Sequence, residues 1–371
     1  MMNASLYGVI REAKKATIDK ILGVRGGSGG LLREEFIDLG SIPETKVELL
    51  PGSPGSAIGT SRDILKDEDF GLIAGILKKH EIRYLLCNGG NGTMETCAKI
   101  YAACKASGFS EISVMGIPKT IDNDLMLTDH SPGFGSAARF MAAGTAEVAA
   151  DLQSLPIHII VMEALGRNTG WLSAASALAK DSFGSGPDLI YLPELAFDEQ
   201  KFLEDVKVLI KEKHSGLVVV SEGLKNSEGI PIVKPIFQIG RAVYYGDTGS
   251  HLAHLIVREL GFKARSEKPG LLGRASVGWQ SPVDRDEAIL AGEMAVRAAI
   301  TGESGKMIAF KRINNDPYKA EPFLAEINDE MLGEKKLPKE FINEQGNGTT
   351  EAFINWCRPL IGPLPELISF R

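Results

Sequence analysis

Short, mainly apolar runs alternate along this chain with longer stretches in which apolar residues recur every three or four positions. The short runs have the length of strands that are covered on both faces, and we expect them at 84–87, 112–115, 157–162, 189–192 and 217–220. The longer stretches predict helices at 70–80, 134–152, 199–213, 248–260 and 284–300, and one that follows residue 90 and ends near 105. This alternation predicts an α/β protein with two doubly wound domains and mainly parallel sheets.

Three segments depart from that pattern. A cluster of glycines at 26–30 follows a short strand and predicts a flexible turn. Residues 265–274 are rich in Arg and Gly and predict a loop. From Asn314 onward we expect a mixture of loops and short helices.

Composition narrows the class of protein. The chain has 371 residues, which is long enough for two domains with a substantial core. Its content of 44% hydrophobic and 24% charged residues is typical of a globular protein. A net charge of −7 argues against a general nucleic-acid binder. The four cysteines form no C-x-x-C pair, which indicates reduced thiols in a cytoplasmic protein. No apolar run reaches the roughly 18 residues that would span a membrane.

Polar groups of complementary chemistry follow the strand at 112–115. Lys119 and Thr120 precede two carboxylates, Asp122 and Asp124, which are separated by one amide. One carboxylate could take a proton from an attacking hydroxyl, the other could hold Mg²⁺, and the lysine could neutralise phosphate oxygens. The alternative is an Asx-rich turn at the end of a strand, with no chemistry.

A glycine-rich turn follows the strand at 84–87 and opens a helix. It contains Gly90, Asn91, Gly92 and Thr93. Glycines in such a turn let backbone N–H groups approach phosphate oxygens at the positive end of the helix dipole. In parallel sheets, ligands bind outside the carboxyl ends of the strands, where both of these turns are expected.

Four motifs in order give the chain a specific resemblance. G-G-N-G-T, P-K-T-I-D-N-D-L, E-A-L-G-R-N-T-G-W and S-E-G resemble the phosphofructokinase family, in particular its pyrophosphate-dependent and related bacterial branch. The resemblance implies phosphoryl transfer from ATP or pyrophosphate to the 1-hydroxyl of fructose 6-phosphate in glycolysis, with Mg²⁺, in a homodimer or homotetramer. It also implies two discontinuous domains. Residues 1–125 plus about 265–300 would bind the phosphate donor, and 126–264 plus about 301–371 the sugar phosphate.

The resemblance also assigns catalytic roles. Asp122 would be the base and would also contact the metal, Asp124 would support the base and the metal, and Lys119 would neutralise charge. Arg62 would stabilise the phosphoryl group in transfer. Asn91 stands where the family usually has an aspartate that helps to hold the metal, so Mg²⁺ is expected to bind less tightly.

Two positions bear on the phosphoryl donor, and they point in different directions. Gly92 stands where pyrophosphate-using relatives carry an aspartate that would repel the α-phosphate of ATP. Lys119 is typical of pyrophosphate users, although some ATP-dependent relatives combine this glycine with a lysine. The balance leans slightly to ATP.

The sugar phosphate would be bound by residues that match the family's substrate-binding positions. These are Thr120, Leu165, Gly166, Arg167, Glu222, Arg265, Arg274 and His158. Arg265 and His158 stand at positions that the family supplies from the neighbouring subunit. Leu165, His158, Leu271 and Gly273 differ from the residues that are usual there.

The start of the chain and the altered positions leave alternatives open. The resemblance implies a strand and a phosphate loop upstream of the first helix, so we expect the sequence to be a fragment or, less favoured, a divergent member with impaired catalysis. A non-catalytic sugar-phosphate-binding regulatory subunit is one alternative function. A kinase of another sugar phosphate is another.

Overall fold

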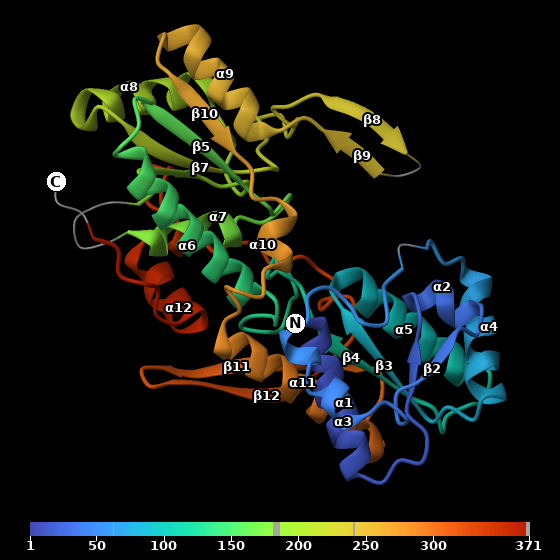
Figure 1. Ribbon diagram of the computed structural model, residues 1–371. Helices are drawn as coiled ribbons and strands as arrows, with labels where there is room; N and C mark the ends of the chain where they lie inside the picture. The colour runs from blue at the N-terminus through green and yellow to red at the C-terminus, as the bar shows by residue number, and fades with distance from the viewer. Residues whose placement is uncertain (62, 181–185, 240–241, 369–371) are drawn as a thin grey trace. The chain divides into compact units, whose positions relative to one another are not determined.

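The computed structural model describes residues 1–61, 63–180, 186–239 and 242–368, which form two compact units (Figure 1). Unit 1 comprises 1–133 and 282–335, and unit 2 comprises 134–281 and 336–371. Residues 301–335 pack in unit 1, because strand β11 (Lys306–Asn315) pairs with β4 (Ser113–Pro118). The compact units are therefore bounded differently from the expected domains, whose separate functions stay a prediction.

The sheet of unit 1 has the strand order β12-β11-β4-β3. Strand β3 (Tyr84–Gly89) is parallel to β4, and β4 is parallel to β11. The fourth strand, β12 (Tyr318–Glu326), is antiparallel to β11 and forms an edge. Loops and short helices were expected here, and that prediction is wrong. Pro322, which the pattern favours in a loop, is tolerated because β12 is an edge strand.

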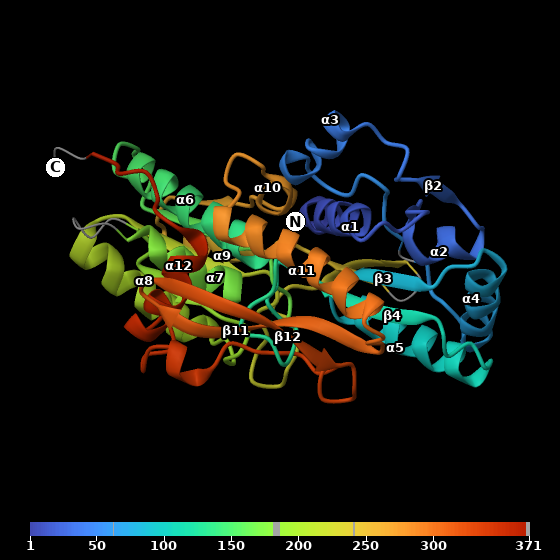
Figure 2. The same ribbon diagram turned by 90° about the horizontal axis from the view of Figure 1, so that it is seen from below.

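Helices flank this sheet. They are α1 (Met2–Lys15), α4 (Asp67–Lys79), α5 (Asn91–Ala106) and α11 (Pro282–Ile300). Figure 2 shows α1 beside α11. Glycines permit this close approach, since a Cβ on Gly8 would lie 2.1 Å from the Ile289 oxygen, and one on Gly292 would lie 2.2 Å from the Ser5 oxygen. Arg297 of α11 also donates to both carboxylate oxygens of Glu12 of α1, at 2.7 and 2.9 Å.

The remaining segment of unit 1 contains a two-stranded antiparallel sheet of β1 (Leu22–Val24) and β2 (Phe36–Asp38), which are joined by helix α2 (Gly27–Leu32). Helix α3 (Glu44–Val47) and a 3₁₀ turn at Leu50–Gly52 follow it. The glycine cluster is thus the start of a helix, and the expected flexible turn is wrong. A Cβ on Gly30 would lie 1.7 Å from the Arg25 oxygen, so glycine is required there by close packing.

Unit 2 has a fully parallel sheet with the order β10-β5-β7-β6. Its strands are β5 (Ile159–Ala164), β6 (Leu189–Tyr191), β7 (Gly216–Ser221) and β10 (Ala264–Glu267). The last was expected to be loop, but it pairs with β5. The central strands β5 and β7 are buried along their whole length, as continuous apolar runs predict. The expected α/β class with mainly parallel sheets is confirmed.

Helices cover the unit 2 sheet, and a hairpin extends from it (Figure 1). The helices are α6 (Phe134–Leu152), α7 (Trp171–Ala175), α8 (Glu199–Lys213), α9 (Thr248–Leu260), α10 (Leu271–Ala275) and α12 (Glu351–Ile361), with 3₁₀ turns at Ser176–Ala179 and Lys339–Phe341. The hairpin pairs β8 (Pro235–Ile239) with β9 (Ala242–Tyr245).

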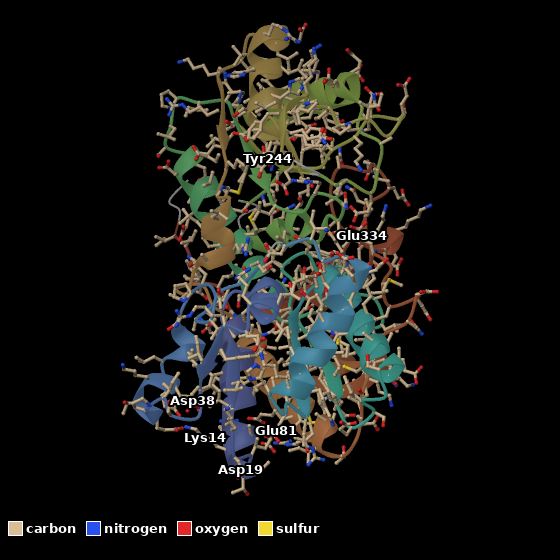
Figure 3. All side chains as sticks on the ribbon, turned by 90° about the vertical axis from the view of Figure 1, so that its right-hand side faces the viewer. Lys14, Asp19, Asp38, Glu81, Tyr244 and Glu334 are labelled. Atoms are coloured by element: carbon tan, nitrogen blue, oxygen red, sulfur yellow. The ribbon has the colours of Figure 1, made fainter. Side chains whose placement is uncertain are left out.

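Charged side chains lie mainly on the surface of each unit. In Figure 3, Lys14, Asp19, Asp38 and Glu81 point outward from unit 1, and all four are exposed. None of the helices in the described ranges has the length and apolar character that crossing a membrane requires.

Candidate active site

Two parallel strands bring the two sequence motifs of unit 1 side by side. In the register of β3 and β4, Asn88 lies opposite Ile117 and Gly89 opposite Pro118. Just beyond, the Lys119 N–H donates to the Gly89 oxygen at 2.9 Å. The glycine-rich turn and the aspartate turn therefore leave the sheet at the same edge, as expected for the carboxyl ends of parallel strands.

Side-chain hydrogen bonds join these turns. The Asn91 amide donates from Nδ2 to Oδ2 of Asp124 at 2.8 Å, and the Thr120 hydroxyl donates to Oδ1 of Asp124 at 3.0 Å. The Asp122 N–H donates to the Thr120 hydroxyl oxygen at 3.1 Å. Each oxygen of Asp124 thus has a donor that fixes its orientation. Asp122 is half-buried on the same turn.

The glycine-rich turn ends in the N-terminus of α5, a helix of 16 residues. Such a terminus favours anions, because its first N–H groups point outward and the helix dipole is positive there. Gly90 caps the helix, and Thr93 lies in its first turn, with its hydroxyl 2.2 Å from where a Cβ on Gly89 would stand. At Gly92 an added Cβ would meet no atom within 4 Å, so this position faces open space.

The oxygen atoms of this turn suit a divalent cation. Oδ1 of Asn91 is buried and has no hydrogen-bond partner, although its amide nitrogen is engaged. Amide and carboxylate oxygens are the ligands that Mg²⁺ prefers, and this ion normally keeps several waters. Among the described residues no group of three or more His, Cys, Asp or Glu is placed to hold a metal. The unpartnered Oδ1 of Asn91 is the observation here that fits a cation which keeps most of its waters.

In unit 2, the turn after β5 contacts the turn after β7. The Glu222 N–H donates to the Ala164 oxygen at 3.0 Å, and Oε1 of Glu222 lies 3.4 Å from the Gly166 nitrogen. A Cβ on Gly223 would lie 1.6 Å from the Arg167 oxygen, so only glycine lets the two turns meet. The E-A-L-G-R and S-E-G motifs are thus adjacent.

A cleft of about 290 Å³ lies at this junction in unit 2. Its lining combines acidic, basic and aromatic side chains. The residues are Glu163, Arg167, Asn168, Glu222, Gly223, Lys225, Pro231, Val233, Tyr244, Tyr245, Gly246 and Lys268. Arg167, Lys225 and Lys268 supply cations suited to a phosphate, and Glu222 supplies acceptors suited to sugar hydroxyls.

Sequence reasoning missed several residues of this cleft. Lys268 lies 2.9 Å from Oε1 of the buried Glu163 and also pairs with Asp247. Burial alone would lower the pKa of Lys268, but the two carboxylates outweigh it and raise the pKa. Tyr244, labelled in Figure 3, comes from the hairpin. These residues lie outside the recognised motifs, so no local signal marks them.

Other predicted substrate residues lie away from this cleft. His158 precedes β5, at the opposite end from Gly166, where it accepts from the Lys263 N–H at 3.1 Å and packs against Phe262. Arg265 lies opposite Ile160 on the edge strand β10 and is exposed.

The predicted site residues Arg274, Leu165 and Arg62 are not among the described residues that line the cleft. Arg274 is exposed on α10, whereas Leu165 and Gly273 line a separate small hollow. Arg62 lies outside the described residues. The roles of these side chains stay predictions.

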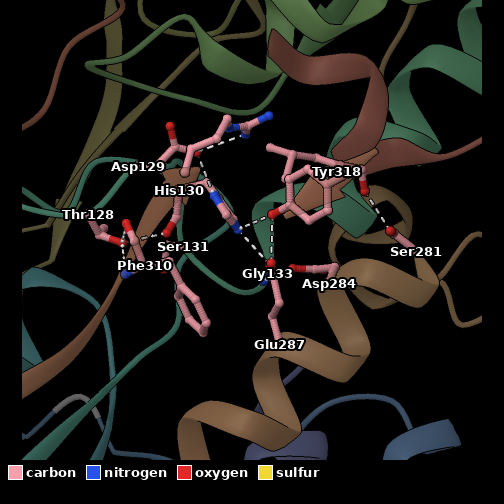
Figure 4. A network of polar contacts seen from close by, with 12 residues as sticks. Thr128, Asp129, His130, Ser131, Gly133, Ser281, Asp284, Glu287, Phe310 and Tyr318 are labelled. Carbon is pink, nitrogen blue, oxygen red and sulfur yellow. Dashed lines mark hydrogen bonds and ion pairs between the residues drawn. The ribbon is translucent and has the colours of Figure 1, made fainter. Parts of the chain in front are cut away.

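A buried charged cluster follows the aspartate turn of unit 1 (Figure 4). Its centre is His130, which is 1% exposed. Nδ1 of His130 lies 2.7 Å from Oδ2 of Asp129, and Nε2 lies 2.6 Å from Oε2 of Glu287. Arg312 donates to Asp129 at 2.8 and 3.0 Å, and the Tyr318 hydroxyl donates to Glu287 at 2.6 Å.

The opposite charges in this cluster favour the charged forms of His130 and Asp129. Burial alone would lower the pKa of His130, but Glu287 and Asp129 raise it to about 9. Burial alone would raise the pKa of Asp129, but His130 and Arg312 hold it well below its usual range. Sequence reasoning did not identify this cluster, because the partners of His130 lie up to 188 positions away along the chain.

Comparison with known proteins identifies the family. The family model described as phosphofructokinase matches residues 1–299. A pyrophosphate–fructose 6-phosphate 1-phosphotransferase from Xanthomonas campestris pv. campestris (strain B100) is 34% identical over 97% of this chain and 88% of its own length. A sulfofructose kinase from Alkalicoccus urumqiensis is 31% identical over 92% of this chain and 88% of its own.

Solved structures agree with the family match. The crystal structure of a pyrophosphate-dependent phosphofructokinase from Nitrosospira multiformis matches with a TM-score of 0.89 and 32% identity, covering 100% of this chain and 91% of that one. The similarity extends over the four motifs and over both compact units. The chain belongs to the phosphofructokinase family.

Proposed function

We propose that this protein transfers a phosphoryl group from pyrophosphate or ATP to the 1-hydroxyl of fructose 6-phosphate, giving fructose 1,6-bisphosphate. The donor's terminal P–O bond breaks, a P–O bond forms to the sugar oxygen, and phosphate or ADP leaves. The observation that carries the proposal is the contact between the two motifs of unit 1. Asn91 of the glycine-rich turn and Thr120 of the aspartate turn both donate to Asp124.

The residues of unit 1 have distinct roles in this reaction. Asp122 takes the proton of the sugar hydroxyl, and the N-terminus of α5 together with Lys119 binds the donor phosphates. Asn91 and Asp124 would hold Mg²⁺, which supplies neutralisation of phosphate charge when bound. Asp124 also keeps the turn in place, because both its oxygens accept hydrogen bonds from the protein.

The cleft of unit 2 would bind the sugar phosphate. Glu222 accepts from sugar hydroxyls, and Arg167 pairs with the phosphate through parallel N–H donors. Lys225 and Lys268 add positive charge to the same cleft. Because catalysis of phosphoryl transfer is mainly positioning and charge neutralisation, these contacts contribute to rate as well as to affinity.

An activity assay distinguishes the two possible phosphoryl donors, ATP and pyrophosphate. The open space at Gly92 leaves room for a bulkier donor such as ATP, whereas relatives at 34% identity are named for pyrophosphate. We would measure fructose 1,6-bisphosphate formation with Mg²⁺ and each donor in parallel. Turnover with one donor alone identifies it, and no turnover with either refutes the proposed reaction.

The assignment of the base is tested by Asp122→Asn. The variant keeps the shape of the turn but cannot accept the proton, so it is expected to lose turnover while still binding fructose 6-phosphate. Asp19→Asn is the matched control, because Asp19 is an exposed carboxylate of the same unit. Retained turnover in Asp122→Asn contradicts the assignment.

A kinase of another sugar phosphate is the second candidate. Three cations line the described part of the cleft, and one relative is named sulfofructose kinase. A panel of other sugar phosphates, with sulfofructose added because of this relative, separates the two candidates. A higher kcat/KM for a sugar other than fructose 6-phosphate would favour this second candidate.

The location of two predicted substrate residues supports a homo-oligomer. His158 and Arg265 lie near the end of β5 that is remote from Gly166. They are therefore too far along the sheet to join the cleft of their own chain, but they could complete the cleft of another copy. We expect a homodimer or homotetramer by light scattering, and a monomer would argue against this role.

The four free cysteines agree with a reducing, cytoplasmic compartment.

A further inference from the structure

The segment 128–133 is hydrogen-bonded directly to the aspartate turn of unit 1. The Thr120 N–H donates to the Pro132 oxygen at 3.1 Å. The Ser131 N–H donates to Oδ1 of Asn123 at 3.0 Å. The position of this segment therefore fixes the turn that carries Asp122.

The turn needs such support because its central residue has an unusual conformation. Asn123, between the two aspartates, is fully buried and has a φ of 51°, in the left-handed region. Asparagine tolerates this region better than most residues, but the conformation still requires external contacts to persist. The hydrogen bond from Ser131 is one such contact.

The segment is held in turn by other elements of unit 1. The Asp129 N–H donates to the Phe310 oxygen at 2.8 Å, and the Phe310 N–H donates to the Thr128 hydroxyl at 2.9 Å. At its other end, the Gly133 N–H donates to Oδ1 of the buried Asp284 at 2.8 Å. Strand β11 and helix α11 therefore anchor its two ends.

His130 links these anchors through its side chain. Both ring nitrogens lie within hydrogen-bond distance of carboxylates, Asp129 on one side and Glu287 of α11 on the other. Those carboxylates also accept from Arg312 and Tyr318, so they act as acceptors. Both ring nitrogens must then donate, which requires the imidazolium form.

We propose that His130 is a positioning residue for the phosphoryl transfer. As an imidazolium between Asp129 and Glu287, it holds segment 128–133 and, through Ser131 and Pro132, the turn that bears Asp122. This role rests on the proposed function. At 1% exposure His130 does not contact substrate, so it acts only through other residues.

The test compares His130→Gln with a matched control. His80→Gln removes another carboxylate-paired histidine of unit 1, one that contacts Glu34 and not the turn. We expect His130→Gln to lower kcat by about tenfold or more, with KM for fructose 6-phosphate changed less than about twofold, because a small misplacement of the base slows the chemical step. His80→Gln is expected to match the wild type. A folded His130→Gln with wild-type kcat overturns the proposal.

A second measurement does not depend on activity. Amide hydrogen exchange in peptides spanning 119–133 is expected to be faster in His130→Gln than in the wild type, while exchange in β5 of unit 2 is unchanged. Equal exchange in 119–133 overturns the positioning role, even if the wild-type protein turns over no sugar phosphate. Absence of turnover in the wild type refutes only the proposed function.

A further variant covers the case in which His130→Gln does not fold. Glu287→Gln keeps the shape and the acceptor oxygen but removes one of the two charges beside His130. It is expected to raise exchange in 119–133 and to lower kcat, as His130→Gln does, but each by a smaller factor than His130→Gln. Wild-type values for both quantities in a folded Glu287→Gln overturn the proposal.

Discussion

The charged state of His130 makes a quantitative prediction about stability and pH. In the folded protein Glu287 and Asp129 outweigh the effect of burial and raise the pKa of His130 from 6.5 to about 9. A group whose pKa is raised on folding stabilises the folded state below its unfolded pKa. That stabilisation is lost as the pH rises through the folded value. The window for His130 therefore runs from pH 6.5 to about 9.

The magnitude follows from the size of the shift. Each pKa unit corresponds to about 1.4 kcal/mol, so the pH-dependent part amounts to about 3 kcal/mol for the shift from 6.5 to about 9. We compare the wild type with His130→Gln, which keeps polarity but does not titrate. The destabilisation caused by this substitution is expected to be about 3 kcal/mol larger near pH 6 than near pH 10.

The neighbours of His130 do not reproduce this dependence. Asp129 stays ionised across the window because its pKa is well below its usual range. Burial and Glu287 raise the pKa of Tyr318, which therefore stays neutral. Burial lowers the pKa of Lys335 to about 7, and this lysine, which donates to the Asp129 oxygen, titrates in both proteins. Because Lys335 contacts the same segment as His130, the comparison is repeated in a Lys335→Met background, which removes this titration.

The assay must report on unit 1 alone. All three tryptophans, Trp171, Trp279 and Trp356, belong to unit 2, so their fluorescence follows unit 2 and serves as an internal control. Hydrogen exchange of β4 and β11 under native conditions reports the opening free energy of unit 1. An equal effect of His130→Gln on this quantity near pH 6 and near pH 10 would refute the reasoning.

Three further predictions follow from close contacts. Asn91→Asp places a second carboxylate beside Asp124, so the variant is expected to gain more thermal stability from added Mg²⁺ than the wild type, and an equal gain contradicts a metal role for this position. Gly223→Ala puts a Cβ 1.6 Å from the Arg167 oxygen, and calorimetry is expected to show sugar-phosphate binding weakened by about tenfold or more. Gly292→Ala puts a Cβ 2.2 Å from a carbonyl oxygen of α1 and is expected to destabilise unit 1 by about 1–3 kcal/mol, measured by hydrogen exchange.

The strands and helices that the sequence predicted are those with a strong local signal. Buried parallel strands give continuous apolar runs, which is why β5 and β7 were placed correctly. Both motif turns of unit 1 were expected at one sheet edge because parallel strands end together, and the hydrogen bond from Asn91 to Asp124 confirms that they meet. These inferences needed only nearby residues and the geometry of parallel sheets.

The elements that sequence reasoning missed have weak or contrary local signals. Strand β12 alternates half-buried and exposed residues and contains Pro322, so it resembles a loop. In α2 the glycines Gly27, Gly29 and Gly30 favour a turn by propensity, but the packing of Gly30 against the Arg25 oxygen decides otherwise. In both cases tertiary contacts outweigh the intrinsic preference of the segment.

The cluster around His130 was missed for a different reason. The partners Glu287 and Tyr318 lie 157 and 188 positions along the chain from His130, so no spacing rule connects them. A histidine beside an aspartate in a loop is common, and only the fold shows that both ring nitrogens meet carboxylates. Residues such as His130, which would act on the aspartate turn through other residues, are therefore not found by a search for the motif itself.

Stability alone does not explain a buried charged cluster at this place. Buried ion pairs often give no more stability than apolar residues of the same volume, because removing the charges from water is costly. Hydrogen bonds, however, are directional, and the segment 128–133 must present the Pro132 oxygen to Thr120 and the Ser131 N–H to Asn123. Apolar packing around residue 130 could fill the space without fixing those directions. The cluster is therefore best explained by the geometry it gives to the turn that carries Asp122, the base of the proposed reaction.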